Sequence, residues 1–375
     1  MKIIIIGGSI GGLSAGIALL CRGYDVEIYE RSTGHMQDRG AGLVIQPDMM
    51  NYLNEYHISA KEVFGVPAYE RQVLDSKGTV THTFQNDTSF TSWNYIWQQL
   101  KDYFPNERYF FGHQLETIEE NEHHVTVHFS NGTRQTANLV IGADGYGSVT
   151  RNHFLPNTAP TYAGYVAYRG LIPENEMTDA EVAFFENKFS IYPYHHSHLL
   201  CYMVPGIKGE LNKGQRLYNW VWYLNKSHEQ LADILTGKDE KTRMYSVPPG
   251  FLSSKSVSDL HAQAHQELPK ILRDRVLQTE SPFVQVIVDM AVLKMYNGRV
   301  AILGDAACVV RPHTASGTAK AYRDAIALAN CLHYHNGDVD KALPHWNDQQ
   351  IREALHLTSY GKQLALRSGL GINLH

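Results

Sequence analysis

Residues 3–30 read IIIIGGSIGGLSAGIALLCRGYDVEIYE, in the order of a strand, a glycine turn, a helix and a second strand. Residues 3–6 are an unbroken apolar run, which is typical of a parallel strand buried on both faces. Gly23 marks the expected end of the helix, and residues 25–29 form the second strand. This order predicts a βαβ unit that binds a dinucleotide.

The glycine turn after the first strand is predicted to bind a pyrophosphate. Gly7 allows the tight turn, and Gly11 and Gly12 let the backbone approach the helix, whose free N–H groups then face the phosphates. Ser9 replaces the second glycine of the G-x-G-x-x-G pattern, but its hydroxyl can donate to a phosphate oxygen. Glu30 ends the second strand, 18 residues after Gly12, where its carboxylate can accept hydrogen bonds from ribose hydroxyls. Any tight turn between a strand and a helix is the alternative interpretation.

Composition limits the class of protein. The 375 residues are enough for two domains, or for one domain with a large insertion. The net charge of -5, without a basic stripe, argues against nucleic acid as a partner. No run of 18 apolar residues predicts a membrane span, so no membrane partner is expected. Four widely spaced cysteines without a CxxC motif favour a reducing compartment, and we expect a cytoplasmic protein.

Histidines are numerous, and their densest cluster is His195, His196 and His198. Two of these would share one face of a strand. A third ligand at a recognised spacing is missing, so no metal site is predicted.

The middle of the chain has a different pattern from its ends. Between about residues 155 and 285, alternating segments rich in Tyr and Trp predict an antiparallel sheet inserted into the nucleotide-binding unit. Residues 299–303 return to a buried parallel strand, and helices extend to about residue 366. We expect an α/β fold with a Rossmann-like domain, an inserted antiparallel-sheet domain and C-terminal helices. The expected division is residues 1–70, 95–155 and 285–375 for the nucleotide-binding domain, and 71–94 and 156–284 for the substrate-binding sheet.

A second nucleotide signal lies near residue 305. Residues 300–307 read VAILGDAA, so Asp305 directly follows a buried strand, and a loop then leads to a helix that starts near Gly317. Asp305 would accept hydrogen bonds from polyol hydroxyls, and the helix start would stabilise negative charge on a ring. A flavin has both a ribityl chain and a ring that becomes anionic when reduced. The alternative is a buried aspartate that caps the next turn.

Three motifs occur in a recognisable order: the glycine turn with Glu30, then GADG at residues 142–145, then the Gly304-Asp305 pair. Their spacing resembles the class A FAD-dependent aromatic hydroxylases, the family of p-hydroxybenzoate and salicylate hydroxylases, over nearly the whole chain. The segments GGSIGGLSAG, GAGLVIQP, PTYAGYVAYRG and GDAACVVRPHTASGTAKA look most like the 2,6-dihydroxypyridine hydroxylase branch. That branch also has serine at the second glycine position.

The resemblance implies FAD as cofactor and NAD(P)H as transient electron donor, and it assigns roles to individual positions. The segment after the first strand would hold the pyrophosphate: Gly7, Gly8, Ser9, Ile10, Gly11 and Gly12. Glu30, Arg31 and Leu115 would lie at the adenosine half, Asp144 near the pyrophosphate and NAD(P)H, and Asp305 at the ribityl chain. The flavin ring would be bordered by Val44, Gln46, Pro312, Gly317, Thr318 and Ala319. Gln98 stands where an arginine often contacts FAD, Cys308 where histidine is usual, and Ala319 where asparagine is usual.

The family chemistry implies that NAD(P)H reduces FAD and that O2 forms a C4a-hydroperoxyflavin, which hydroxylates a small aromatic or hydroxylated N-heterocyclic substrate. A general base is expected, and His313 is the first candidate because the Pro312 loop borders the flavin. Tyr202, Trp220 and Trp222 are candidate walls of the substrate pocket. The alternatives are that His313 only caps a helix and that the strand aromatics are core residues.

Two other activities were weighed against this interpretation. An FAD-dependent oxidoreductase of the same fold would not transfer oxygen, and an NAD-dependent dehydrogenase would use only the first motif. The Gly304-Asp305 segment and the lack of a Tyr-x-x-x-Lys constellation argue against the dehydrogenase. Expected partners are a small aromatic substrate and O2, and a homodimer is an assembly to test.

Overall fold

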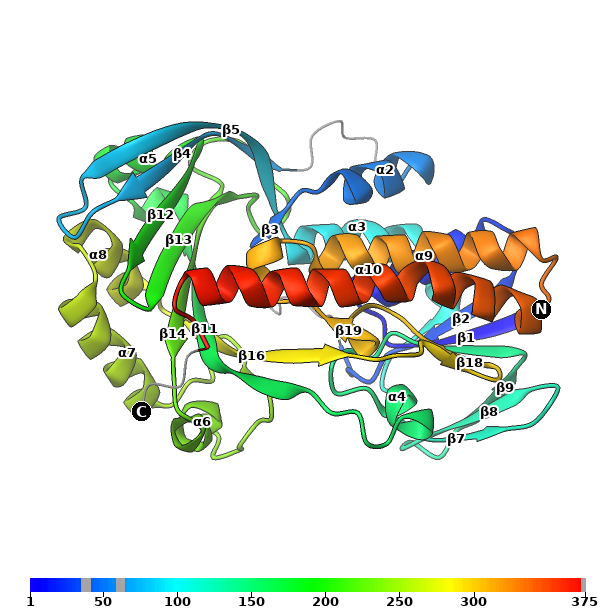
Figure 1. Cartoon of the computed structure of the whole chain (residues 1–375). Coiled ribbons are helices and arrows are strands. Elements are labelled where there is room, and N and C mark those ends of the chain that lie inside the picture. Colours follow the sequence, from blue (N-terminus) through cyan, green and yellow to red (C-terminus); the bar gives the residue numbers. More distant parts are fainter. Residues whose placement is uncertain (35–41, 59–64, 372–375) are drawn as a thin grey trace.

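The computed structural model describes residues 1–34, 42–58 and 65–371, and its strands form three sheets (Figure 1). Gly40 and Ala41 of the GAGLVIQP motif lie outside the described residues. The predicted α/β class, with a parallel sheet, an inserted sheet and C-terminal helices, is confirmed.

The six-stranded sheet contains the predicted βαβ unit and has the order β17-β18-β10-β1-β2-β6. Its strands are parallel except for β17, which pairs antiparallel with β18. Ile3 and Ile5 pack on the helices, whereas Ile4 and Ile6 pack on a small three-stranded sheet, which is why this strand has no polar face. The strands are β1 (Lys2–Ile6), β2 (Asp25–Tyr29), β6 (Tyr109–Phe110), β10 (Leu139–Gly142), β17 (Tyr296–Asn297) and β18 (Val300–Ile302).

Two further layers cover the six-stranded sheet. The three-stranded sheet consists of β7 (Leu115–Glu120), β8 (Val125–Phe129) and β9 (Arg134–Ala137), with α4 (Val149–Phe154) beside it. The opposite face is covered by helices α1 (Ile10–Leu20), α2 (Pro47–Glu55), α3 (Trp93–Tyr103), α9 (Gly317–Tyr334) and α10 (Val339–Arg367). Figure 1 shows α10 extending from this sheet to the larger one, so it joins the two halves of the molecule.

The ten-stranded sheet follows the order β15-β16-β11-β14-β13-β12-β4-β5-β3, with β19 paired to β16. The described pairs are antiparallel except β12 with β4, which differs from the prediction of a purely antiparallel sheet, because β4 comes from a distant segment. The strands are β3 (Gly42–Val44), β4 (Val66–Leu74), β5 (Val80–Ser92), β11 (Thr161–Pro173), β12 (Lys188–Tyr194), β13 (Ser197–Val204), β14 (Leu217–Asn225), β15 (Ser246–Val247), β16 (Phe283–Ala291) and β19 (Cys308–Val309).

One face of this sheet forms a core with four helices: α5 (Asp179–Phe185), α6 (His228–Leu235), α7 (Ser254–Glu267) and α8 (Lys270–Gln278). The other face is turned toward the six-stranded sheet. Short 3-10 turns occupy η1 (Asn106–Arg108), η2 (Glu174–Glu176), η3 (Gly304–Ala306) and η4 (Pro312–Thr314). The proposed division at residues 70, 94, 155 and 284 stays a prediction, and β3 already pairs with β5 before the first of these positions.

Two further features of the described ranges bear on function. No helix there combines the length and the apolar run that crossing a bilayer requires. Within the same ranges, no three His, Cys, Asp or Glu side chains gather as metal ligands.

Candidate active site

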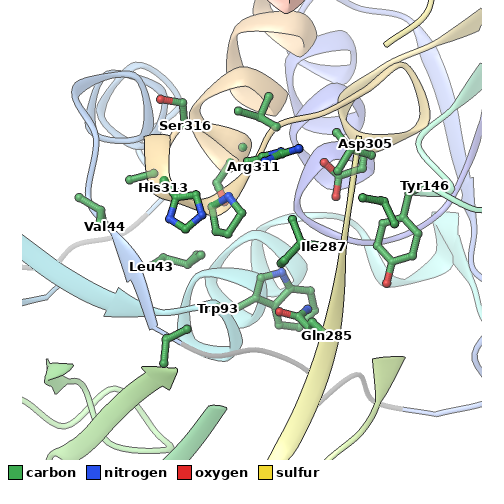
Figure 2. Close-up of a pocket in the computed structure, with 18 of the residues that line it drawn as sticks. Leu43, Val44, Trp93, Tyr146, Gln285, Ile287, Asp305, Arg311, His313 and Ser316 are labelled. Carbon is green, nitrogen blue, oxygen red and sulfur yellow. The ribbon is translucent and has the colours of Figure 1, made fainter. Parts of the chain in front are cut away.

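A cavity of about 1400 Å³ lies between the two larger sheets and is lined by residues from both. Four of its segments follow the carboxyl ends of adjacent parallel strands: Gly7 after β1, Glu30 after β2, Asp144 after β10 and Asp305 after β18. Parallel strands end at one edge of their sheet, so motifs that are far apart in sequence meet there. Figure 2 shows Asp305 and Tyr146 on one side of this cavity and His313 and Val44 on another.

The glycine turn is shaped by its own backbone. Gly7 has a φ of +104°, and a Cβ on it would overlap the Ala143 carbonyl. A Cβ on Gly12 would overlap the Gly7 carbonyl oxygen. Gly11 differs, because its Cβ would meet only the side chains of Leu303, at 3.4 Å, and Ala321, at 3.6 Å, both at ordinary contact distance, and Gly11 lines the cavity. The turn therefore requires Gly7 and Gly12 for packing, whereas Gly11 keeps open space beside the cavity.

The start of α1 has hydrogen-bonding capacity to spare. Ser9 is its N-cap but its side chain makes no capping hydrogen bond. Ser9, Ile10 and Gly11 line the cavity. The first N–H groups of a helix have no partner within the helix, and together with the helix dipole they attract an anion. This end of the cavity therefore suits a phosphate group.

Glu30 is buried, and its carboxylate already joins two parts of the turn. One oxygen accepts from the backbone N–H of Gly8 at 2.8 Å. The other accepts from the backbone N–H and the hydroxyl of Ser32, at 2.9 and 2.6 Å. A carboxylate has about four acceptor sites, so one remains on the oxygen bonded to Gly8. Glu30 thus organises the turn and can accept one further hydroxyl.

Asp144 lines the cavity, but its carboxylate is used within the chain. It accepts from the Ser148 hydroxyl at 2.5 Å, and from the backbone N–H and hydroxyl of Thr150 at 3.0 and 3.1 Å. Burial raises the pKa of Asp144, and these hydrogen bonds oppose that rise. Arg151 then donates to the Ala306 carbonyl at 3.1 Å and so ties this loop to the segment of Asp305. The side chain of Asp144 therefore has a structural function in the loop.

Asp305, unlike Asp144, is not hydrogen-bonded within the described chain. Its side chain is exposed to the cavity and has no hydrogen bond or ion pair with the described residues. Surrounding protein desolvates the carboxyl and raises its pKa to about 6, although Lys320 opposes the shift. Below it, Lys320 and Asp324 form a buried ion pair at 2.5 Å, and Asp324 also accepts from the backbone N–H of Gly304 at 2.9 Å. Asp305 is thus an acceptor that lacks a donor among the described residues.

The start of α9 forms the next part of the wall. Ser316 is the N-cap, but its hydroxyl donates to the Thr314 carbonyl at 2.9 Å rather than to the helix. Gly317 and Thr318 line the cavity, and a Cβ on Gly317 would meet nothing within 4 Å. Ala315 has a φ of +53°, a left-handed conformation that turns the chain into the helix. This helix start also offers free N–H groups to negative charge.

His313 lies where the loop before α9 meets the ten-stranded sheet. Its Nε2 is 2.8 Å from the Tyr165 hydroxyl. Burial lowers the pKa of His313 to about 3, with smaller contributions from His198 and Arg311. Arg311 is held by Asp289 through two hydrogen bonds of 2.8 and 2.7 Å. At neutral pH His313 is therefore uncharged, and it is a weak base.

On the wall formed by the ten-stranded sheet, every second side chain of a strand faces the cavity. Val221 and Tyr223 of β14 line the cavity, and the β13 residues paired opposite to them, Leu200 and His198, do so as well. Tyr202 also lines the cavity, and its ring stacks on Phe90 with 3.8 Å between centroids. The cavity-facing side of this wall therefore combines aromatic rings with the aliphatic side chains of Leu200 and Val221.

The expectation for Trp220 and Trp222 is corrected. Both side chains are fully buried on the opposite face of β14, in the core with the helices. The indole N–H of Trp220 donates to Thr279 at 2.8 Å, and that of Trp222 donates to Tyr194 at 2.9 Å. Alternate residues of a strand point to opposite faces, so placing Val221 and Tyr223 on the cavity excludes these two tryptophans.

Most predicted cofactor residues line the cavity: Gly7, Ser9, Ile10, Gly11, Glu30, Arg31, Val44, Leu115, Asp144, Asp305, Pro312, Gly317 and Thr318. Five do not belong to its described lining: Gly8, Gly12, Gln46, Gln98 and Ala319. The Gln98 amide instead donates to Asp102, one turn along α3, at 2.6 Å. Cys308 is buried against α10, with its sulfur 3.0 Å from the Thr358 hydroxyl.

Sequence reasoning missed several residues of the wall, among them Trp93, Tyr146, Arg169, Gln285 and Ile287. Arg169 could have been found from the pattern of β11, because a charged residue within an apolar strand indicates a special environment. The others are aromatic, amide or aliphatic residues without a distinguishing signal.

Comparison with known proteins agrees with this geometry. Residues 1–166 match the FAD binding domain family, and residues 162–289 match a family described as FAD binding domain-like. The chain is 35% identical to 2,6-dihydroxypyridine 3-monooxygenase of Paenarthrobacter nicotinovorans, over 98% of this chain and 91% of the relative. It is 26% identical to 6-hydroxynicotinate 3-monooxygenase of Pseudomonas fluorescens, over 91% and 86%. The solved structure of 2,6-dihydroxypyridine-3-hydroxylase from Arthrobacter nicotinovorans superimposes with a TM-score of 0.92 at 34% identity, over 98% of this chain and 92% of that one.

Proposed function

Because the chain belongs to the class A FAD-dependent aromatic hydroxylases, we propose that it hydroxylates a small hydroxylated nitrogen heterocycle of the dihydroxypyridine type. It is an FAD-dependent monooxygenase, with NAD(P)H as the electron donor typical of such enzymes. The observation that carries the substrate proposal is the 35% identity to a dihydroxypyridine monooxygenase over 98% of the chain. Identity over this length includes the sheet that lines the cavity as well as the glycine turn.

The residues present fit FAD. We propose that the start of α1, with Ser9 and Gly11, holds the pyrophosphate, and that Glu30, Arg31 and Leu115 hold the adenosine half. Asp305 is a carboxylate without a donor, which suits the hydroxyls of a ribityl chain. The start of α9, with Pro312, Gly317 and Thr318, and Val44 opposite would border the ring. When bound, FAD takes two electrons from NAD(P)H and supplies the activation of O2 for oxygen transfer.

The chain's own residues position the substrate and exclude water. The volume of about 1400 Å³ exceeds the ~300–1,000 Å³ of a typical drug-sized pocket, which leaves room for a dinucleotide and one small ring. Tyr202, Tyr223 and Phe90 offer flat apolar surfaces for such a ring, and the tyrosine hydroxyls offer hydrogen bonds. His313, uncharged and joined to Tyr165, can orient a polar group of the substrate. Aromatic side chains on this wall would cover one face of the reacting ring and so limit its contact with water.

The proposal is tested by measuring NAD(P)H oxidation by the FAD-loaded enzyme with 2,6-dihydroxypyridine, 6-hydroxynicotinate and a simple phenol. We expect a dihydroxypyridine to accelerate oxidation and to yield a product that is heavier by one oxygen atom. Hydrogen peroxide is measured in parallel, because uncoupled turnover also consumes NAD(P)H. Only peroxide with every compound would contradict oxygenation, and preference for the simple phenol would contradict the substrate class.

The alternatives weighed from sequence are not favoured. An NAD-dependent dehydrogenase and a non-oxygenating FAD oxidoreductase both disagree with relatives that are monooxygenases over nearly the whole chain. We also propose a cytoplasmic location, which is supported by four cysteines that are all unpaired.

A further inference from the structure

Arg169 is a cation on the cavity wall that lacks an anion. It lies on β11, paired with Val221 of β14 and Phe283 of β16, and its side chain lines the cavity. Its Nε is buried without a hydrogen-bond partner, and no carboxylate of the described residues forms an ion pair with it. Arg311 on the same wall is neutralised by Asp289. A partly buried guanidinium without a counter-charge is costly, so an anion in the cavity would stabilise it.

The surroundings of Arg169 suit an aromatic oxyanion. Its charge acts on Tyr202 and on Tyr223, where it opposes the rise in pKa that burial causes. All three side chains line the cavity beside Phe90. A flat ring packed against Tyr223 and the stacked pair Phe90 and Tyr202, with a negative oxygen directed at the guanidinium, would combine ring contacts with a charge-assisted hydrogen bond.

The two histidines packed against Tyr223, His198 and His313, are not strong bases. The titratable groups of this wall among the described residues include Tyr194, His198, Tyr202 and Tyr223 on the sheet and His195 and His196 in the turn between β12 and β13, with Arg71, Arg311 and His313 facing them from β4 and the loop before α9. Tyr165 does not line the cavity, but its hydroxyl lies 2.8 Å from the His313 ring. Burial lowers the pKa of His198 to about 4 and that of His313 to about 3, and it raises the pKa of each of these tyrosines. The acids among the described lining residues, Glu30, Asp144 and Asp305, all lie at the opposite end, after the parallel strands. A base of such low pKa removes little of a ring-hydroxyl proton.

We propose that Arg169 binds a ring oxyanion of the substrate, so that the enzyme takes the hydroxypyridine in its already ionised form. This assignment rests on the proposed function and identifies the residue that selects the ionisation state. The ring-hydroxyl proton then goes to bulk solvent before or during binding rather than to a protein base. An ionised ring is also the more electron-rich form, which the oxygen transfer requires.

The test is calorimetric titration of the FAD-loaded enzyme with 2,6-dihydroxypyridine in the absence of NAD(P)H. Titrations are made above and below the ligand's own pKa, in two buffers of different ionisation enthalpy. Below that pKa we expect Kd to rise about tenfold for each unit by which the pH is lowered, with one proton released per ligand bound. Above it, Kd should be constant and no proton should be exchanged. A Kd that ignores pH below the ligand's pKa, without proton release, would overturn the assignment.

Variants separate a binding effect from a folding effect. Arg169→Gln should raise Kd roughly 10- to 100-fold at a pH above the ligand's pKa, because a hydrogen bond to a charged group is lost. Arg169→Lys should recover part of this, and Arg134→Gln, on the exposed three-stranded sheet, should match wild type. FAD content and Tm report folding for each variant, and unchanged affinity in a folded Arg169→Gln protein would refute the role. Failure of wild type to bind 2,6-dihydroxypyridine at any pH would instead overturn the substrate class, and with it this assignment.

Discussion

The two ends of the cavity differ in how their recognition groups are built. The nucleotide end uses short segments that follow β1, β2, β10 and β18, and it offers backbone N–H groups and carboxylates. The sheet end uses single side chains from several strands, and it offers aromatic rings and cations. The first end depends on the path of the backbone, and the second depends on which face of each strand is turned inward.

Unsatisfied groups are also distributed differently. At the nucleotide end, Asp144 and Glu30 are bonded within the chain, and Asp305 alone of these three carboxylates has no partner among the described residues. At the sheet end, the buried nitrogens without a hydrogen-bond partner include Nε of the cation Arg169 and Nδ1 of His198. Opposite charges without partners at opposite ends indicate two different ligands, a polyol with hydroxyl donors and an anion.

The largest effect is expected at the glycine turn, because its conformation depends on the close approach of backbone segments. Gly12→Ala places a methyl group against the Gly7 carbonyl, so the turn must move. We expect loss of at least 1–3 kcal/mol of stability, about the cost of overpacking, together with loss of bound FAD. Flavin absorbance and Tm measure both. Gly34→Ala, where a Cβ would meet nothing within 4 Å, is the matched control and should retain FAD.

Two neighbours on β14 sharpen the contrast between strand faces. Trp222→Ala empties part of the helix-covered core and should cost about 3–5 kcal/mol of unfolding free energy. Tyr223→Phe removes only a hydroxyl on the cavity face, so we expect a stability change below about 1 kcal/mol and a several-fold higher KM. Denaturant unfolding and steady-state kinetics distinguish them. The milder Trp222→Phe keeps the comparison valid if the alanine variant does not fold. Equal changes in KM and in stability for the Trp222 and Tyr223 variants would contradict the placement of these two side chains on opposite faces of β14.

Asp305 tests the unpartnered carboxylate. Its pKa of about 6 in the folded protein exceeds its ordinary 3.8, so the folded state binds more protons than the unfolded chain between these values. Stability of the FAD-free enzyme should therefore fall as pH rises through this window and stay low above it. Asp305→Asn should raise the Tm of FAD-free protein near neutral pH, with the difference vanishing below pH 3.8.

The same variant should bind FAD roughly tenfold more weakly, because charge-assisted hydrogen bonds to hydroxyls are lost. Asp259→Asn, on the exposed part of α7, should change neither the Tm profile nor FAD affinity. A flat Tm difference across pH would show that Asp305 finds a partner in the FAD-free protein.

The smallest effect is expected at Gln98. Its amide bonds to Asp102 on the surface of α3, away from the described cavity lining. Gln98→Ala should therefore change the Kd for FAD by less than about twofold, the scale of a surface substitution. Fluorescence titration with FAD measures this change. A tenfold loss of FAD affinity would instead support the contact between residue 98 and FAD that the family resemblance implies.

How far the sequence could predict the site follows from the same contrast. The glycine turn, Glu30 and Asp305 were predictable because strand, turn and acid are adjacent in the chain. The family resemblance places Asp144 near the pyrophosphate and NAD(P)H, and this role stays a prediction. Its hydrogen bonds to Ser148 and Thr150 depend on how α4 folds back, which the sequence does not show. Gln98 and Ala319 were carried over from the family pattern, and the sequence held no sign that they face elsewhere.

The order of motifs in the sequence therefore determined the fold class and, through the family resemblance, the cofactor, because each segment that is predicted to bind phosphate or hydroxyl groups directly follows a buried strand. Tertiary structure decided the substrate wall. β14 is buried on both faces, so its residues Trp220 to Tyr223 are all apolar or aromatic and show no polar alternation. Strand periodicity says which residues share a face, but only the packing of α5–α8 on one side shows that Val221, Tyr223 and Arg169 face the cavity.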